Sequence, residues 1–220
     1  MKLISANVYE ENGVIFTLSD FKKSIYGEKI IQKNKNVYRE WNPKRSKIAA
    51  ALFRKLKKLN IKEDSKILYL GCASGTTLSH ISDIAKKGII FALDKSEKEM
   101  RIMHLKLKNR NNIAPILDDA NNTENYKKQL NRIKVDFIIQ DVASPNQTEI
   151  LIQNAKEFLN KDGELYFSLK TKSISQIKEQ KEILEDAKKQ LTKENFEILK
   201  SVNLRKYEDN HWLLHLRKNF

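Results

Sequence analysis

From residue 66 onward the sequence alternates between short apolar runs and longer stretches whose apolar residues recur at helical spacing. The apolar runs predict strands at residues 66–70, 89–93, 113–117, 135–140 and 164–169. The stretches between and after them predict helices at residues 76–85, 96–108, 123–131, 147–158 and 174–191. Because strands connected through helices form right-handed βαβ units, this alternation predicts a Rossmann-like α/β fold with a mainly parallel sheet.

The two ends of the chain depart from this alternation. Strands predicted at 196–202 and 211–216 have no helix between them, so we expect a C-terminal antiparallel hairpin on the sheet. Near the N-terminus, strand-forming residues occupy 2–9, 13–19 and 27–32, and Ser46 is a plausible N-cap for a helix over 48–59. The prediction is a small N-terminal β domain at residues 1–40, followed by the main domain at residues 41–220.

Composition restricts the class of protein. The 220 residues carry a formal net charge of +14, and residues 21–58 alone hold thirteen Lys and Arg against two Glu. Such a segment suits a polyanionic partner, although a solvated lysine-rich surface explains it equally well. No apolar run approaches the roughly 18–20 residues of a membrane span, and the start lacks the apolar core of a secretory signal. The single cysteine excludes a disulfide framework and a Cys-rich zinc site, and no metal site is expected.

A glycine turn follows the first strand of the predicted sheet. The segment Gly71-Cys72-Ala73-Ser74-Gly75 joins this strand to a helix. Two glycines permit a tight turn and close approach of a ligand, and the helix start offers free N–H groups. The spacing is neither the Gly-x-Gly-x-x-Gly of dinucleotide sites nor a phosphate loop. The alternative is a turn that only connects strand and helix, with Cys72 as a small packing residue.

Two acidic residues follow neighbouring strands. Asp94 ends the second strand, where a carboxylate commonly accepts hydrogen bonds from ribose hydroxyls. Asp119 follows the third strand, in a position to meet an adenine amino group. Asp94 equally suits a role at the start of the following helix. Together with the glycine turn, the two aspartates indicate an adenosine-bearing ligand.

Further polar residues belong to the same predicted edge. Asp141 follows the fourth strand, Lys170 ends the fifth, and Lys47 begins the first large helix. An ammonium at the end of a buried strand is costly unless paired, which predicts an Asp141–Lys170 ion pair. A solvated Lys170 is the alternative. His211 begins the last strand, where a lone histidine is more often a packed or solvated residue than a catalytic one.

Several sequence blocks now support a family resemblance. Residues 38–51, Tyr-Arg-Glu-Trp-Asn-Pro-Lys-Arg-Ser-Lys-Ile-Ala-Ala-Ala, resemble the signature of the fibrillarin family. The glycine-turn block at 68–83 is similar to that family's cofactor loop. The blocks at 118–120, 140–143 and 168–170 match further motifs in the same order, so the resemblance covers nearly the whole chain.

The resemblance implies a methyltransferase sheet and an archaeal ribose 2′-O-methyltransferase that uses S-adenosyl-L-methionine. It implies a box C/D ribonucleoprotein with a Nop5-type scaffold protein, an L7Ae-type RNA-binding protein and a guide RNA, acting on rRNA and tRNA in the archaeal cytoplasm. The family's catalytic set maps onto Lys47, Asp141, Lys170 and His211. With the turn residues, the expected cofactor contacts are Gly71, Ala73, Gly75, Thr76, Thr77, Asp94, Lys95, Asp119, Ala120, Asp141, Val142, Ala143 and Ser144.

The chain departs from the family pattern at a few positions. Ser144 replaces a glutamine, Asp94 a glutamate and Cys72 an alanine, and Trp212 is bulkier than the usual residue. Two other functions remain as alternatives: a stand-alone RNA base methyltransferase and a non-catalytic RNA-binding scaffold subunit. A nicotinamide oxidoreductase is a more distant alternative because the glycine spacing is wrong for it.

Overall fold

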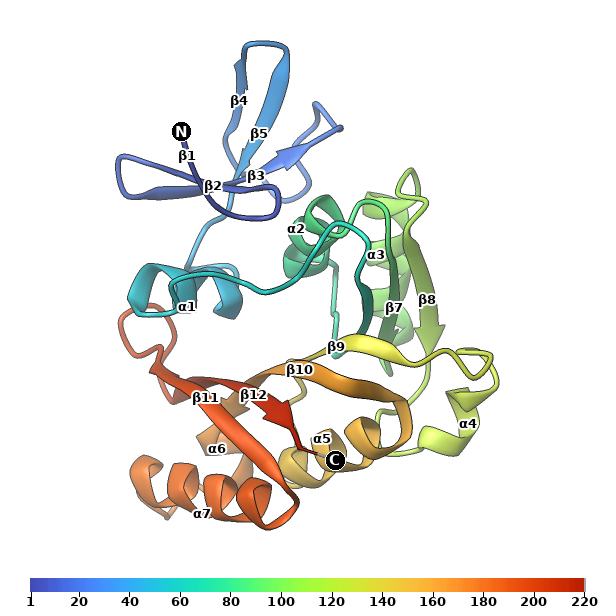
Figure 1. Cartoon of the computed structure of the whole chain (residues 1–220), viewed down its shortest axis with the longest axis vertical. Coiled ribbons are helices and arrows are strands. Elements are labelled where there is room, and N and C mark those ends of the chain that lie inside the picture. The colour runs from blue at the N-terminus through green and yellow to red at the C-terminus, as the bar shows by residue number, and fades with distance from the viewer. Residues whose placement is uncertain (220) are drawn as a thin grey trace.

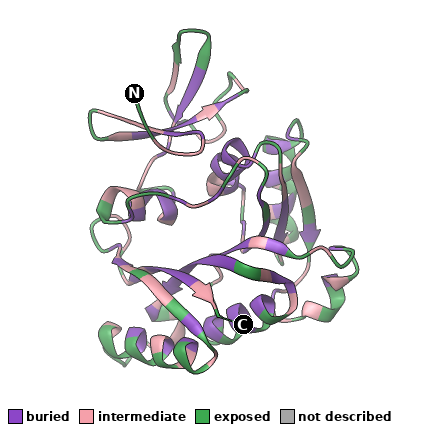
Figure 2. Ribbon diagram, in the orientation of Figure 1, coloured by how far each residue is buried: buried purple, intermediate pink, exposed green. Residues whose placement is uncertain are grey.

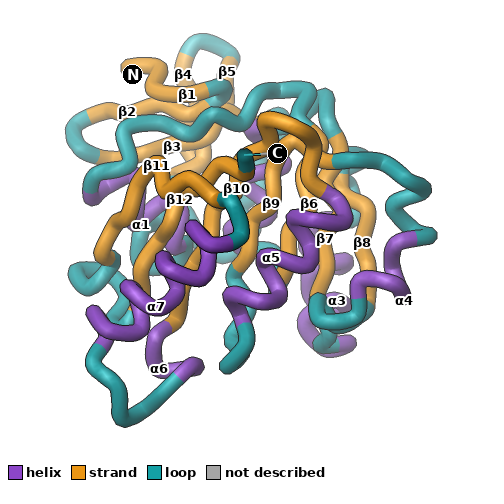
Figure 3. Tube along the Cα trace, turned by 60° about the horizontal axis from the view of Figure 1, so that its bottom comes forward, coloured by secondary structure: helices purple, strands orange, loops and turns teal. Residues whose placement is uncertain are grey.

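The computed structural model describes residues 1–219, and its largest element is a seven-stranded sheet of order β11-β12-β10-β9-β6-β7-β8 (Figure 3). Its strands are β6 (Lys66–Leu70), β7 (Ile89–Asp94), β8 (Ile113–Leu117), β9 (Val135–Gln140), β10 (Leu159–Lys170), β11 (Phe196–Asn203) and β12 (His211–Lys218). Strands β6 to β10 run parallel, whereas β12 lies antiparallel to β10 and to β11. The predicted α/β fold with a C-terminal antiparallel hairpin is confirmed.

Helices cover both faces of this sheet (Figure 1). One core cluster joins one face to α1 (Lys47–Arg54), α2 (Thr76–Ile84) and α3 (Glu97–Leu107). The second core cluster joins the other face to α4 (Thr123–Lys127), α5 (Gln147–Phe158), α6 (Thr171–Ile174) and α7 (Gln180–Lys193). In β6, Ile67 and Tyr69 face the first cluster and Leu68 and Leu70 the second, because successive side chains of a strand point to opposite faces. In Figure 2 the buried residues, in purple, lie along the strands of this sheet.

No helix within residues 1–219 combines the length and the apolar character needed to cross a bilayer.

The N-terminal residues form a separate antiparallel sheet of order β1-β2-β3-β5-β4. Its strands are β1 (Lys2–Ser5), β2 (Val8–Glu11), β3 (Val14–Ser19), β4 (Ile30–Lys33) and β5 (Asn36–Glu40). The single strand predicted at 2–9 is wrong: the chain turns at Asn7, whose φ of 55° belongs to the left-handed region that asparagine tolerates. The hairpin of β4 and β5, which the sequence analysis did not predict, turns at Asn34 and Lys35 with φ of 50° and 67°, the backbone conformation of a type I′ turn.

Three helix predictions also need correction. The helix predicted at 174–191 begins only at Gln180, as α7, and Ile174 is instead the last residue of α6. Between them the Ser175 hydroxyl accepts the backbone N–H groups of Ile177 and Lys178 and competes with helix continuation. Helix α4 ends at Lys127 instead of Asn131, and helix α1 ends at Arg54 instead of Leu59. Leu59 is nevertheless buried, so an apolar residue at helical spacing belongs to an irregular segment here.

A buried ion-pair network joins the N-terminal sheet to α2. Arg39 of β5 has no exposed surface, and its guanidinium lies 2.7 Å from the carboxylate of Glu28 and 2.6 Å from that of Asp83 on α2. Asp83 also pairs with Arg110 at 2.7 Å. Burial alone raises the pKa of Glu28, but the N–H groups of Tyr26 and residue 25, with Arg39, outweigh it and lower that pKa to about 2. Glu28 is therefore ionised, and both Glu28 and Asp83 have a buried arginine as their partner.

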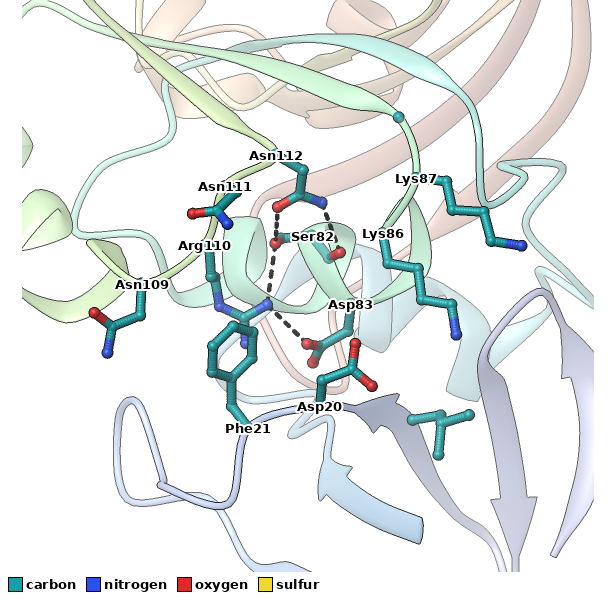
Figure 4. A pocket seen from close by; sticks show the side chains of 12 residues that line it. Asp20, Phe21, Ser82, Asp83, Lys86, Lys87, Asn109, Arg110, Asn111 and Asn112 are labelled. Carbon is teal, nitrogen blue, oxygen red and sulfur yellow. Dashed lines mark hydrogen bonds and ion pairs between the residues drawn. The ribbon is translucent and has the colours of Figure 1, made fainter.

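The same junction contains a hollow of about 290 Å³ beside the C-terminal end of α2 (Figure 4). Phe21 covers the Arg110 guanidinium, with 4.4 Å between the guanidinium carbon and the ring centre. Asn7 reaches the same helix end and donates to the carbonyls of Asp83 and Ile84. The N-terminal sheet shares the first core cluster through Val8, and the division into domains at residue 40 stays a prediction.

Replacing Arg39 with methionine tests this network. We expect Arg39→Met to lower the free energy of unfolding by about 3–5 kcal/mol, because it leaves Glu28 as a buried charge without its partner. Urea denaturation measures the change. The control is Arg101→Met, which breaks an exposed pair with Glu97 and should change stability by less than about 0.5 kcal/mol. Equal effects of the two substitutions would contradict the assignment.

Candidate active site

The carboxyl ends of β6, β7 and β9 meet at the glycine turn. Gly71 has φ +77°, and a β-carbon there would lie 2.6 Å from the carbonyl oxygen of Asp141. The Gly71 N–H donates to Leu93 at the end of β7, and the Asp141 N–H donates to Leu70 at the end of β6. Glycine is therefore required at position 71 both by its backbone conformation and by the close approach of the loop after β9.

The turn leads directly into α2. Gly75 has φ +85°, and a β-carbon there would lie 2.7 Å from Leu107 of α3. No side chain caps the first turn of α2, where Thr76 and Thr77 lie, so its N–H groups are not occupied by a cap. The Thr77 hydroxyl donates to the Ser46 hydroxyl at 3.0 Å, which ties the start of α2 to the start of α1.

The Asp94 carboxylate bonds to both the glycine turn and the start of the following helix. One carboxylate oxygen accepts the Ala73 N–H at 2.8 Å, and the other accepts the Ser96 N–H at 2.9 Å. Both alternatives for Asp94 are compatible with this geometry, since each carboxylate oxygen keeps a lone pair after accepting one bond. Ala73 itself is exposed at the crevice edge.

Asp119 lies on the next loop and is held by Asn121. The Asn121 N–H donates to its carboxylate and is the main cause that lowers the pKa of Asp119, with the ammonium of Lys95, 3.6 Å away, adding to the effect. The neighbouring Ala120 is buried. Asp119 is thus an ionised acceptor that is only partly buried.

The loop after β9 carries Asp141, Val142, Ala143 and Ser144. Ser144 donates to the side-chain oxygen of Asn146, and the Asn146 amide donates to Asn121 at 2.7 Å. Val142 and Ala143 are at least partly exposed. This loop is therefore joined through side chains to the loop that holds Asp119, and the predicted cofactor residues lie on linked segments.

Asp141 pairs with a different lysine from the one predicted. Its carboxylate lies 2.9 Å from the Lys47 ammonium, and both side chains are partly buried. The predicted Asp141–Lys170 ion pair is wrong, since no carboxylate within residues 1–219 lies within 4.0 Å of the Lys170 ammonium. The α1 N-cap at Ser46 places Lys47 at this end of its helix, an arrangement across 94 residues that the sequence does not specify.

Lys170 and His211 are direct cross-strand partners on β10 and β12. Their side chains therefore lie on the same face of the sheet. The His211 Nδ1 lies 2.7 Å from the Asp209 carbonyl, which can only accept, so Nδ1 carries the proton and Nε2 is the acceptor of the neutral ring. Burial is the main cause that lowers the pKa of His211; Lys47 lowers it further, whereas Asp141 opposes the shift. His211 is thus within electrostatic reach of the Lys47–Asp141 pair.

Other candidates have structural roles. Burial raises the pKa of the Cys72 thiol to about 12, which fits the packing role predicted for it. His80 is fully buried between Thr17 and Tyr26, with 2.8 Å to each hydroxyl, and burial lowers its pKa well below the usual value. Residues 1–219 hold no group of three or more His, Cys, Asp or Glu side chains that could bind a metal ion.

Sequence reasoning missed two residues of this site. Ser46 was predicted only as a helix cap, and its hydrogen bond to Thr77 depends on the tertiary fold. Gln147 was predicted only as the first residue of a helix, yet it is fully buried and contacts the backbone of Lys170. No local pattern distinguishes Gln147 from an ordinary helix-start glutamine.

Comparison with known proteins identifies the family of this chain. The fibrillarin family model matches residues 5–219. This chain belongs to the fibrillarin family. Among its fibrillarin relatives, the fibrillarin-like rRNA/tRNA 2′-O-methyltransferase of Methanocaldococcus jannaschii is 45% identical over 217 residues, covering 96% of this chain and 94% of the relative. The resemblance predicted from the sequence blocks is confirmed.

Two solved fibrillarin structures share this fold over all or most of the chain. A fibrillarin from a fibrillarin/Nop5p complex matches with a TM-score of 0.91 and 38% identity, covering 100% of both chains. Aeropyrum pernix fibrillarin, crystallised with natively bound S-adenosyl-L-methionine, matches with a TM-score of 0.84 and 38% identity. That match covers 92% of this chain and 88% of the other. The fold of this chain, with both of its sheets, is therefore shared with the fibrillarin of the complex.

Gly71→Ala tests the contact at the centre of the site. The left-handed backbone alone should cost about 1–2 kcal/mol, and the contact with the Asp141 carbonyl about 1–3 kcal/mol more. Gly13→Ala is the matched control, because Gly13 has φ +75° and nothing within 4 Å of an added β-carbon. Urea denaturation of both variants isolates the contact. Identical losses would show that the close approach at Gly71 does not matter.

Proposed function

We propose that this chain transfers a methyl group from S-adenosyl-L-methionine to ribose 2′-hydroxyls of rRNA and tRNA, as the catalytic subunit of a guide-RNA-directed box C/D ribonucleoprotein. The observation that carries the proposal is the Lys47–Asp141 ion pair beside the glycine turn, at the sheet edge that also holds Lys170 and His211. Membership of the fibrillarin family supports it, as does the S-adenosyl-L-methionine bound to the Aeropyrum pernix relative.

The residues of the crevice fit this cofactor. The carboxylates of Asp94 and Asp119 retain acceptor capacity for ribose hydroxyls and an adenine amino group. The uncapped first turn of α2 offers N–H groups, and Gly71 brings the backbone close. The remaining contacts would come from Ala73, Gly75, Thr76, Thr77, Lys95, Ala120, Asp141, Val142, Ala143 and Ser144. When bound, the cofactor supplies an electrophilic methyl carbon on a sulfonium.

The residues of the chain must orient the 2′-hydroxyl and handle its proton. Lys170 is the group we assign nearest to that hydroxyl, either as a neutral amine that accepts the proton or as an ammonium that stabilises the developing oxyanion. Because Asp141 is paired with Lys47, its negative charge is not in direct contact with Lys170. Lys47 and His211 would orient the substrate and adjust the local charge.

Target selection would depend on partners. The expected partners are a Nop5-type scaffold protein, an L7Ae-type RNA-binding protein and a box C/D guide RNA, in the cytoplasm of an archaeal cell. A relative has been solved in a fibrillarin/Nop5p complex, which supports the first of these. The basic segment 21–58 would hold phosphates without reading bases, which leaves target choice to the guide RNA.

Replacing Lys170 tests the catalytic assignment. In the assembled complex, Lys170→Ala should lower the rate of methyl transfer by about 10²–10⁴-fold. The dissociation constant for S-adenosyl-L-methionine, measured by calorimetry, should stay within about threefold, since the cofactor contacts lie elsewhere. The matched control, Lys172→Ala, removes an exposed lysine two residues away and should leave the rate unchanged. Parallel loss of binding and transfer would make Lys170 a structural residue.

Assays of the isolated chain test whether the choice of target depends on the guide RNA and the partner proteins. We expect it to bind RNA weakly, with an affinity that falls steeply between about 50 and 200 mM salt, and to methylate no defined site alone. Mapping of modified nucleotides after assembly with guide RNA and partners should locate the methyl group on riboses. Modified bases would favour the stand-alone base methyltransferase, and failure to bind S-adenosyl-L-methionine would favour the non-catalytic subunit.

A further inference from the structure

The end of β10 extends beyond its neighbour β9. The last residues that β9 and β10 pair in register are Gln140 and Phe167, after which the chain leaves the sheet at Asp141. Strand β10 continues to Lys170, supported on its other side by β12. The Thr171 N–H donates to Asn210 on the β12 side. Since successive peptide groups alternate between the two sides of a strand, those of Lys170 point to the side that β9 has left.

The Gln147 side chain lies beside Lys170, on the side of β10 that β9 no longer covers. Its Oε1 accepts the Lys170 N–H at 2.9 Å, and its Nε2 donates to the Lys170 carbonyl at 3.0 Å. One amide thus satisfies both main-chain groups of Lys170, as the peptide groups of an adjacent strand would. Gln147 has no exposed surface, so water does not replace these bonds.

The same glutamine holds the loop that carries Asp141. Its Nε2 also donates to the Ser144 carbonyl at 2.9 Å. The main-chain carbonyl of Gln147 accepts a hydrogen bond from the side-chain amide of Gln140, the last residue of β9, at 2.6 Å. Gln147 is therefore the side chain through which the end of β10 and the loop of residues 141–144 are held together.

We propose that Gln147 is a positioning residue for the methyl-transfer reaction: its amide replaces the missing strand at the end of β10 and fixes the main chain of Lys170 relative to the Asp141 loop. This inference rests on the proposed function. The Lys170 side chain is long and flexible, so the place of its α-carbon decides where its amine can lie. A shift of about 1 Å in a reacting group can reduce a rate by about 10²-fold.

Gln147→Leu removes all three side-chain hydrogen bonds at similar volume. In the assembled complex, the single-turnover rate at saturating S-adenosyl-L-methionine should fall at least tenfold, whereas the dissociation constant for S-adenosyl-L-methionine should change less than threefold. Gln190→Leu is the matched control: the side chain of this glutamine on α7 donates to the exposed Glu149, away from Lys170, and the rate should stay within twofold of wild type.

Gln147→Glu provides a signature that a general loss of stability would not produce. A protonated glutamic acid keeps one donor and one acceptor, and can bond both main-chain groups of Lys170. The ionised carboxylate can only accept and repels the carbonyls of Lys170 and Ser144. The rate relative to wild type should therefore be highest at low pH and fall as pH rises, with circular dichroism verifying that the variant stays folded throughout.

Three results would overturn the proposal: a Gln147→Leu rate within twofold of wild type, a loss of cofactor affinity in proportion to the rate, or a Gln147→Glu ratio that does not change with pH. If Gln147→Leu does not fold, the Gln147→Glu series decides alone. Absence of methyl transfer by the wild-type complex would instead reject the proposed function, so the two failures are distinguishable.

Discussion

The absence of a side chain at Gly71 is the constraint on which the candidate active site depends. A β-carbon there would lie 2.6 Å from the Asp141 carbonyl, so β6 and the loop after β9 can lie side by side only with glycine at this position. This approach brings Asp141 next to the turn that begins α2. The proposed cofactor residues and Lys47 then converge on one edge, because the carboxyl ends of parallel strands share that edge.

The N-terminal sheet contributes to the site indirectly. Arg39, buried between Glu28 and Asp83, ties the sheet to α2, the helix that starts at the glycine turn. Trp41, which precedes α1, stacks on His80 of the same helix with ring centres 5.0 Å apart. The segment that leads into α1 is thereby held against α2 at two residues, Arg39 and Trp41. Lys47, at the start of α1, pairs with Asp141. The N-terminal sheet is in this sense a support for the position of one proposed catalytic lysine.

The four proposed catalytic residues form two pairs that are held together by different interactions. Lys47 and Asp141 neutralise each other through a direct ion pair, whereas Lys170 and His211 are neighbours through strand register. Burial lowers the pKa of His211, so its ring is neutral near pH 7. The Lys170 amine has no carboxylate within 4.0 Å in the described part of the chain, which is compatible with the role we propose for it toward a substrate hydroxyl.

The sequence by itself determined the α/β alternation, the C-terminal hairpin and the family, since apolar periodicity and contiguous motifs such as residues 38–51 are local properties of the chain. It did not determine the turns at Asn7 and Ser175, where side-chain and backbone hydrogen bonds compete with regular structure. Only the tertiary structure decided that Lys47 and not Lys170 pairs with Asp141, and that Gln147 replaces a strand beside Lys170. Those contacts join residues far apart in the chain, and their geometry exists only once helices and strands have packed.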